Sequence, residues 1–278
     1  MLVLAGCSSV KLGYSNGAQL AWWYLDGYVD FNRAQSPVVK QGLQDLFTWH
    51  RATQLPDYTV VLTQAQQAVT EPTTAAATCR WWQRVQDTLD PTIDRALLQA
   101  AQVVPTLGEA QFKHLEGKYA KVLDDMRGDY MQPDAEDRLA ASLKRAMNRA
   151  EQLYGSLDES QRKVVAAGVA ASPFDAQAWM QERQRRQRDT LQTLRRLVVE
   201  RADADQRPAA LRTLLERTQR SPDPAYRAYQ QRLSDYNCAL AAQIHNATTP
   251  AQRQRARQRL KGWEEDFRAL AAAAAAPV

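Results

Sequence analysis

The sequence predicts an all-α protein, an antiparallel multi-helix array of about a dozen helices with short connections and no sheet. Glycine is scarce, at 11 of 278 residues, while Ala, Gln, Arg and Leu dominate, and these four residue types favour helix. Capping side chains that can begin a helix recur along the chain. Only residues 58–62 have the β-branched density of a strand, and they run directly into helix-favouring residues 63–68.

The first feature along the chain is a lipobox, Leu4-Ala5-Gly6-Cys7. The peptidase that processes lipoproteins needs small side chains before the cut, and the cysteine thiol then carries a diacylglyceryl thioether. We therefore expect residues 1–6 to be the remnant of a lipoprotein signal, Cys7 to be lipidated, and residues 7–16 to be a linker. The alternative is a chance match in an ordinary N-terminal segment.

The leader and the residue after Cys7 add two expectations. Only Met1–Val3 precede the lipobox, whereas a secretory signal needs an apolar region of about 7–15 residues. Either the start codon is placed too late or the sequence begins inside the leader. Ser8, in place of Asp, favours sorting to the outer membrane of a Gram-negative cell. No apolar run approaches the roughly 18 residues of a spanning helix, so we expect a lipid-anchored protein that faces the periplasm.

Residues 17–33 form the most aromatic of the expected helices. Positions 20, 24, 28 and 31 place apolar residues on one helical face, and Trp22, Trp23 and Leu25 widen it. Core packing is the favoured interpretation of the two tryptophans. The alternative is a membrane-interface belt beside the lipid anchor.

Capping residues mark the later helix starts. Five of them stand directly before a proline, which is tolerated at the first helical position: Ser36, Asp90, Ser172, Asp223 and Thr249. Asp134 with Asp137 and Asp158 with Gln161 add further capping-type starts. The expected helices are 17–33, 36–53, 58–70, 74–88, 91–104, 108–129, 134–154, 158–170, 173–201, 206–219, 224–246 and 250–271.

A change in composition near Ala171-Ser172 divides the expected array into two lobes of one domain. Residues 17–171 form an N-terminal helical lobe, and residues 172–272 form an Arg/Gln-rich C-terminal lobe. Residues 273–278 continue an alanine run and are expected to be a disordered tail. With Cys7 lipidated, Cys79 and Cys238 remain, and they either form a disulfide between the lobes or stay buried free thiols.

Basic charge concentrates in the C-terminal lobe. Between Gln177 and Arg220 there are eleven arginines and six acidic residues, a surplus equal to the +5 of the whole chain. No residue from Gln181 to Thr190 is apolar, so this stretch must project into solvent or meet a polar partner. We expect a binding surface at Arg183, Arg185, Arg186 and Arg188. The alternative is a merely solvated face. Envelope proteins or anionic lipid headgroups are the expected partners, and nucleic acid is not expected.

The sequence offers few signs of enzymatic chemistry. It has no glycine-rich phosphate loop, no G-x-S-x-G and no H-E-x-x-H, and His50, His114 and His245 lack a second ligand at zinc spacing. We therefore expect a non-enzymatic protein with no metal or cofactor. One alternative is a cell-wall or lipid-modifying hydrolase with converging carboxylates such as Asp125 and Glu265, and another is a structural assembly subunit.

A five-residue phrase close to Leu-Thr-x-x-Gln recurs at 62–66, 107–111, 157–161 and 248–252. Its second residue can cap a helix while the glutamine three positions later bonds back to it. The phrase resembles small periplasmic helical proteins of the envelope-stress type, which act as chaperones or stress-sensor repressors. Only residues 62–66 match that motif in full.

Several motifs carry a second resemblance that covers nearly the whole chain: the lipobox, Lys11–Asn16, Trp22-Trp23 with Asp26–Asp30, and Trp49–Arg51 before Leu55–Tyr58. They resemble a family of uncharacterised Gram-negative lipoproteins, a domain of unknown function. The resemblance implies a periplasm-facing helical lipoprotein. It implies no activity.

Overall fold

The structure, a computed structural model, describes residues 9–275 and is all α-helical over that range, as predicted, with no strand among the described residues. Twelve α-helices and one 3₁₀ turn follow one another within residues 9–275. Their bounds are α1 Ser9–Ser15, α2 Gly17–Val29, α3 Gln35–Ala68, α4 Ala75–Asp87, α5 Asp90–Val103, η1 Val104–Thr106, α6 Glu109–Tyr130, α7 Ala135–Tyr154, α8 Glu159–Ala170, α9 Ala176–Val199, α10 Gln206–Gln219, α11 Pro224–Asn246 and α12 Pro250–Ala275.

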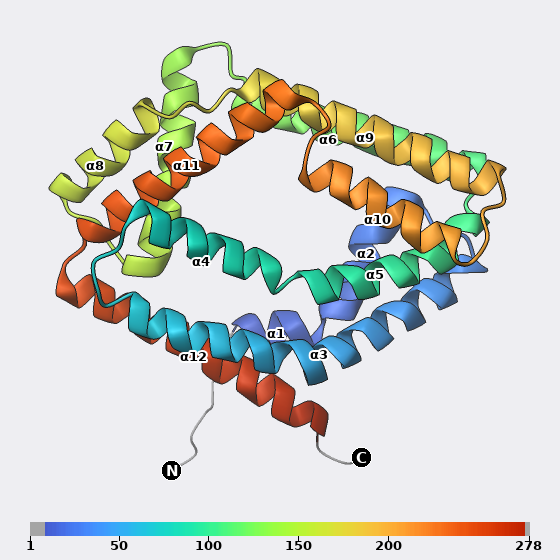
Figure 1. Cartoon of the computed structure of the whole chain (residues 1–278), viewed down its shortest axis with the longest axis horizontal. Helices are drawn as coiled ribbons and strands as arrows, with labels where there is room; N and C mark the ends of the chain where they lie inside the picture. The colour runs from blue at the N-terminus through green and yellow to red at the C-terminus, as the bar shows by residue number, and fades with distance from the viewer. Residues whose placement is uncertain (1–8, 276–278) are drawn as a thin grey trace.

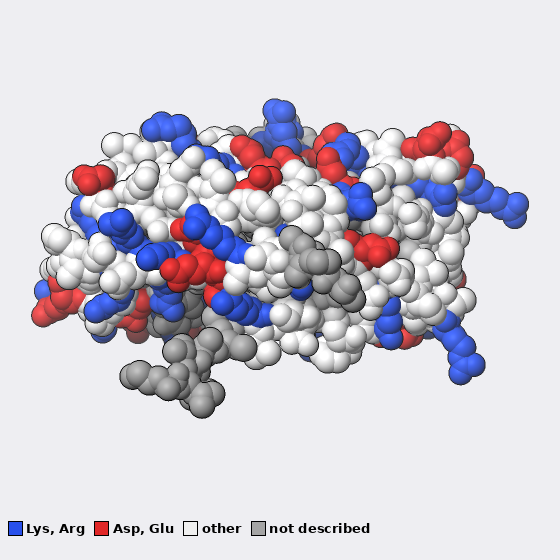
Figure 2. Space-filling model, turned by 90° about the horizontal axis from the view of Figure 1, so that it is seen from below, with Lys and Arg blue, Asp and Glu red and all other residues white. Residues whose placement is uncertain are grey.

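Two long antiparallel helix pairs form opposite edges of the molecule (Figure 1). One edge is α3 with α12, the most extensive helix pair, and the other is α6 with α9. Helices α7, α8 and α11 connect the edges at one end of the molecule, and α2, α5 and α10 connect them at the other. Seen from the side of α3 and α12, basic and acidic residues are interspersed, so no single-sign patch covers this face (Figure 2).

Helix α3 corrects one expected boundary. The two expected helices 36–53 and 58–70 are one continuous helix that contains Pro56. A proline inside a helix removes a backbone hydrogen bond and disfavours the preceding turn. In α3 the neighbouring Leu55 is almost completely buried, and α12 packs along the helix. Tertiary packing therefore overrides the local signal.

The two ends of the described chain give two further corrections. Helix α1 begins at Ser9, inside the stretch 7–16 that was expected to be a linker. Helix α12 continues to Ala275, into the alanine run that was expected to be disordered. Cys7 and residues 276–278 lie outside the described residues.

The expected helix starts fall into two groups: those that a side chain caps as predicted, and those where it does not. Three aspartates accept backbone N–H hydrogen bonds as predicted: Asp134, Asp158 and Asp223. Thr249 also accepts one, from the backbone of Gln252. The prediction was wrong at Ser172, because α9 begins four residues later with Asp175 as its cap. It was also wrong at Ser36 and Asp90, which lie within the first turn of α3 and α5.

The Leu-Thr-x-x-Gln phrase forms a cap where its match is incomplete, and no cap where the match is full. Residues 62–66 lie inside α3. There Thr63 donates to the carbonyl of Thr59, and the buried Gln66 donates to Glu264 of α12. Helices α6, α8 and α12 begin at the other three phrases. The one stretch that matches the phrase in full, residues 62–66, therefore contacts another helix and caps none.

Glutamines from two capping phrases bond to each other at the start of α8 and α12. Gln161 Oε1 accepts from the backbone of Asp158, and Gln252 Oε1 accepts from the backbone of Thr249. The two side-chain amides also donate to each other, at 2.7 and 2.9 Å. We call this pair, Gln161 with Gln252, the second glutamine junction. It holds together the N-termini of two helices although the two glutamines are 91 positions apart in the sequence.

The first glutamine junction, Gln35 with Gln111, repeats this arrangement at the start of α3 and α6. Gln35 Oε1 accepts from the backbone of Asn32, and Gln111 Oε1 accepts from the backbone of Gly108. The amides donate to each other at 3.2 and 2.7 Å. Four helices, two in each half of the chain, are therefore fixed at their first turns.

A disulfide joins the two expected lobes. It links Cys79 of α4 to Cys238 of α11, with 5.3 Å between the Cα atoms. The α3–α12 pair and the second glutamine junction also cross the expected boundary at residue 171. The most extensive helix–helix contacts therefore lie between residues 17–171 and residues 172–272.

Candidate functional site

The contact between α6 and α9 has ion pairs at one end and aromatic rings at the other. Near the start of α6, Arg195 pairs with Glu109 and Glu116, at 3.0 and 2.7 Å. At the opposite end the ring of Tyr130 lies 4.9 Å from that of Trp179, measured between centroids. The first half of α9, where the arginines were expected to form a binding surface, therefore starts beside an aromatic group.

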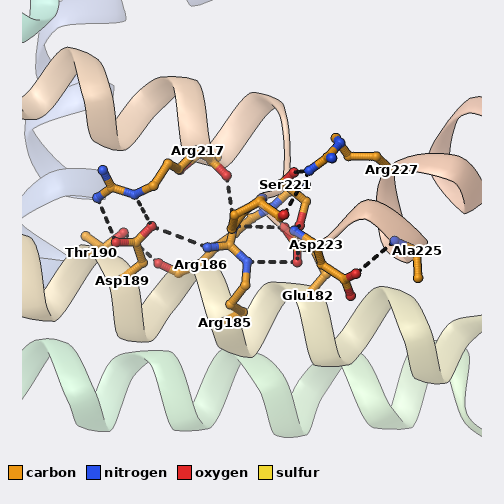
Figure 3. Close-up of polar contacts among 12 residues, drawn as sticks. Glu182, Arg185, Arg186, Asp189, Thr190, Arg217, Ser221, Asp223, Ala225 and Arg227 are labelled. Atoms are coloured by element: carbon orange, nitrogen blue, oxygen red, sulfur yellow. Dashed lines mark hydrogen bonds and ion pairs between the residues drawn. The ribbon is translucent and has the colours of Figure 1, made fainter.

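Glu182 is the centre of a polar network that α9 makes with the end of α10 (Figure 3). Only 5% of Glu182 is exposed. Arg185 donates two hydrogen bonds of 2.9 Å to it, Arg186 donates one of 2.9 Å, and the Ser221 hydroxyl donates one of 3.0 Å. Burial opposes ionisation of Glu182, but these hydrogen bonds outweigh it, so its pKa lies below the ordinary value.

Asp189 extends the network by one helical turn (Figure 3). It accepts two hydrogen bonds from Arg217 of α10, at 2.9 and 2.8 Å, and pairs with Arg185 at 3.3 Å. Hydrogen bonding by Arg217 is the largest cause that lowers the pKa of Asp189. Bidentate Arg–carboxylate geometry fixes orientation as well as charge, so this network locks α10 against α9.

The network changes the interpretation of the four expected arginines. Arg185 and Arg186 are not an open binding surface, since both are half-buried and paired with carboxylates of their own helix. Arg188 is exposed. Residues 181–190 were expected to project into solvent or to meet a polar partner. The second alternative holds for Arg185, Arg186 and Asp189, and their polar partners lie within the protein.

Arg183 differs from its neighbours. Its guanidinium lies over the ring of Trp179, 4.5 Å from the centroid, and its Nε is buried without a hydrogen-bond partner. Among residues 9–275 no carboxylate lies within ion-pair distance of Arg183. Burial, followed by the nearby charge of Arg186, lowers its pKa. Arg183 is therefore a partly desolvated cation beside a closed ion-pair network.

Three tyrosines lie near this cation. The ring of Tyr130 packs on Trp179, and Tyr226 and Tyr28 are close enough to interact electrostatically with Arg183. Burial raises the pKa of Tyr226, and a hydrogen bond with Tyr24, followed by burial, raises the pKa of Tyr28 to about 12. Both stay protonated at neutral pH and can donate hydrogen bonds. We call Arg183, Tyr28, Tyr130, Trp179 and Tyr226 the Arg183 cluster.

The chemistry of the Arg183 cluster is that of an anion site. A guanidinium offers several donors in one plane, which suits a carboxylate or a phosphate. The Trp179 ring holds the guanidinium of Arg183 by cation–π contact, and the hydroxyls of the neighbouring tyrosines are hydrogen-bond donors. Sequence reasoning found Arg183 but missed the aromatic members, because they come from α2, α6 and α11 as well as α9. Only the Trp179–Arg183 spacing of one helical turn signals the contact.

The histidines lie apart and are engaged with other groups. His245 Nε2 lies 2.7 Å from the carbonyl oxygen of Glu71, to which it donates, and its Nδ1 accepts from Tyr154 at 2.8 Å. His50 lies between the hydroxyls of Tyr14 and Tyr58, at 2.7 and 3.3 Å. Burial lowers the pKa of both imidazoles.

The carboxylates of the alternative hydrolase are not brought together. Asp125 on α6 pairs with Lys121, and Glu265 on α12 pairs with Lys261, each one turn earlier on the same helix. Helices α6 and α12 belong to opposite edges of the molecule (Figure 1). This pair cannot flank one bond.

Comparison with protein-family models identifies a family for this chain. The model of a family of unknown function, DUF6279, matches residues 27–227, well over half of the chain. The chain belongs to this family. Comparison with curated proteins and with solved structures gives no match. The matched residues include the whole Arg183 cluster and its ion-pair network, whereas Gln252 of the second glutamine junction lies beyond them.

Proposed function

We propose that this member of DUF6279 is a periplasm-facing lipoprotein of the outer membrane with a non-enzymatic binding role. Its target is an anionic envelope component with a phosphate-bearing headgroup. The observation that carries the binding role is Arg183, a partly buried cation that lies over the Trp179 ring and has no carboxylate partner among the described residues. Chaperone-like binding of acidic clients would use the same chemistry.

The location has its own support. The lipobox at Cys7 provides a site for lipid attachment, and the disulfide between Cys79 and Cys238 is of the kind that persists outside the cytoplasm. Within the described residues no helix is both long enough and apolar enough to cross a bilayer. An acylated cysteine supplies the attachment that this proposal needs.

Binding is tested with glycerol 3-phosphate as the probe, by isothermal titration calorimetry at fixed ionic strength. Arg183→Gln should weaken binding by about tenfold or more, because it removes a charge-assisted bidentate contact. Arg188→Gln is the matched control, an exposed arginine on the same helix, and should bind like the wild type. Equal affinity of the Arg183→Gln protein, or no binding by any form, would contradict the proposal.

The location is tested by mass spectrometry on cells that export the chain behind a lipoprotein signal peptide. We expect an acylated N-terminal Cys7 in the outer-membrane fraction and an unreduced peptide pair linked through Cys79 and Cys238. Replacing both cysteines with serine should cost about 2–5 kcal/mol of stability, measured by urea unfolding. An unmodified Cys7 in the soluble fraction, with both thiols free, would overturn the assignment.

A further inference from the structure

The end of α1 and most of α2 form a stretch of chain without charged side chains. From Leu12 to Leu25 the sequence has no Asp, Glu, Lys or Arg. Hydrogen bonds from Asn16 to the carbonyl of Leu12, and from Leu20 to the carbonyl of Asn16, join α1 to α2. The two helices therefore present one uncharged segment near the start of the described chain.

The inner side of this segment is closely packed. Trp22 is buried and stacks on Phe31, with centroids 5.5 Å apart, and Lys40 of α3 lies over its ring. A Cβ atom at Gly17 would lie 2.2 Å from the ring of Phe47, so α2 approaches α3 as closely as a glycine allows. Core packing, the favoured interpretation of the tryptophans, is right for Trp22.

The outer side is apolar and aromatic and remains open. Trp23 is 61% exposed. Leu20 and Tyr24, which lie three residues before it and one after it, are also exposed and share one face of α2 with it, and Leu12 of α1 is exposed as well. These four residues, Leu12, Leu20, Trp23 and Tyr24, form what we call the α2 face. Exposed apolar side chains that gather on one uncharged surface commonly mark an interaction site.

We infer that the α2 face rests in the interfacial region of the lipid bilayer to which the chain is anchored. The inference depends on the proposed lipidation of Cys7 for its geometry. Cys7 precedes the first residue of α1 by two positions, a span of roughly 7 Å at most. A lipid on Cys7 thus holds α1, and α2 after it, at the membrane surface.

The chemistry of the face matches this occupant. Tryptophan and tyrosine have an apolar body and one polar atom, and they favour the boundary between water and lipid. An uncharged face can enter that boundary without desolvating an ion. Helix α1 lies beside α12 and α2 contacts α3 and α6, so docking of the α2 face would fix the orientation of both long edges relative to the membrane.

The test uses the full chain with Cys7→Ser, which cannot be acylated, and vesicles of phosphatidylethanolamine and phosphatidylglycerol. Co-flotation should show weak binding that persists at high salt, because no charge on the face is available for screening. Trp23→Ser should lower the partition coefficient by about tenfold. Because the assay needs no lipid on Cys7, its failure is distinct from failure of the proposed anchor.

The matched control is Trp82→Ser. Trp82 of α4 is 57% exposed, close to the exposure of Trp23, but its helix carries Arg80, Arg84 and Asp87. This variant should bind vesicles like the parent chain, and circular dichroism should show both variants fully helical. No vesicle binding by the parent chain, or equal loss in both variants, would overturn the inference. It would also be overturned if light scattering revealed a dimer that Trp23→Ser dissociates while vesicle binding is unchanged.

Discussion

The two glutamine junctions use the same hydrogen bonds but differ in burial and in their caps. The Gln161–Gln252 bonds are buried, whereas the Gln35–Gln111 bonds are partly buried. In the second junction Asp158 and Thr249 both accept backbone N–H groups through their side chains. In the first junction Asn32 does so, but Gly108 has no side chain to offer.

The equivalence extends to the loops around each pair. Gln161 donates to the carbonyl of Ala247 and Gln252 to that of Ser156. Gln35 donates to the carbonyl of Thr106, and Gln111 to that of Asp30. In all four cases the acceptor lies two residues before the residue whose backbone N–H bonds to the partner glutamine. One arrangement therefore occurs twice, and its two copies differ in how completely they are satisfied.

The largest expected effect comes from breaking the second junction. Gln161→Met keeps the length of the side chain but removes the bonds of Gln161 to the buried Gln252 amide, to the carbonyl of Ala247 and to the backbone N–H of Asp158. Gln252 keeps its bonds to Ser156 and Thr249. The expected loss is about 2–4 kcal/mol of unfolding free energy. Gln35→Met should cost about 1 kcal/mol less, because its partner is nearer to solvent. Urea unfolding followed by circular dichroism measures both.

Gln206 supplies a control for this prediction. It forms the same capping box, accepting from the backbone of Asp203 at 3.1 Å, but it is exposed and has no paired glutamine. Gln206→Met should therefore cost less than about 1 kcal/mol. If all three variants lose the same stability, the pairing of glutamines contributes nothing beyond the cap.

A smaller effect is expected from completing the first junction. Gly108 has φ −112° and ψ 170°, which any residue can adopt, and a Cβ atom there would meet nothing within 4 Å. Gly108→Ser should add the missing cap and reduce the freedom of the unfolded chain, a gain of about 0.5–1 kcal/mol. Gly108→Ala also reduces the freedom of the unfolded chain but adds no cap, so it should stabilise less than Gly108→Ser. A Tm of the Ser variant at or below that of the Ala variant would contradict this explanation.

The smallest effect concerns pH. The backbone hydrogen bond from Gln161, followed by the Ser160 hydroxyl, lowers the pKa of Asp158. A lowered folded-state pKa gives stability that is present above the unfolded value, near 3.9, and is lost as pH falls through the folded value. The Tm advantage of the wild type over Asp158→Asn should therefore narrow as the medium is acidified from about pH 5 to pH 3.

The first junction provides the comparison for this pH dependence, since Gly108 cannot ionise. Gly108→Asp should introduce at the first junction the acid sensitivity that Asp158 gives to the second. Thermal unfolding of Gly108→Asp and Gly108→Ser over the same pH range measures it. Parallel pH profiles of the two variants would show that the cap carboxylate makes no charge-dependent contribution.

The sequence by itself determined the helical class and those helix starts at which one side chain bonds to backbone within three residues. Asp134, Asp158, Asp223 and Thr249 cap as predicted because such a bond needs only local chain geometry. Arg183 could be selected from composition, since a run of polar residues on one helix needs partners. The same reasoning could not separate Arg183 from Arg186.

Only the tertiary structure decided which polar groups satisfy each other. Arg217 reaches Asp189 across 28 residues, and Gln252 reaches Gln161 across 91. The continuity of α3 through Pro56 likewise follows from burial against α12. The physical reason is common to all three: a local pattern fixes which hydrogen bonds a residue can make, but burial decides which must be made, and burial depends on residues far away in the chain.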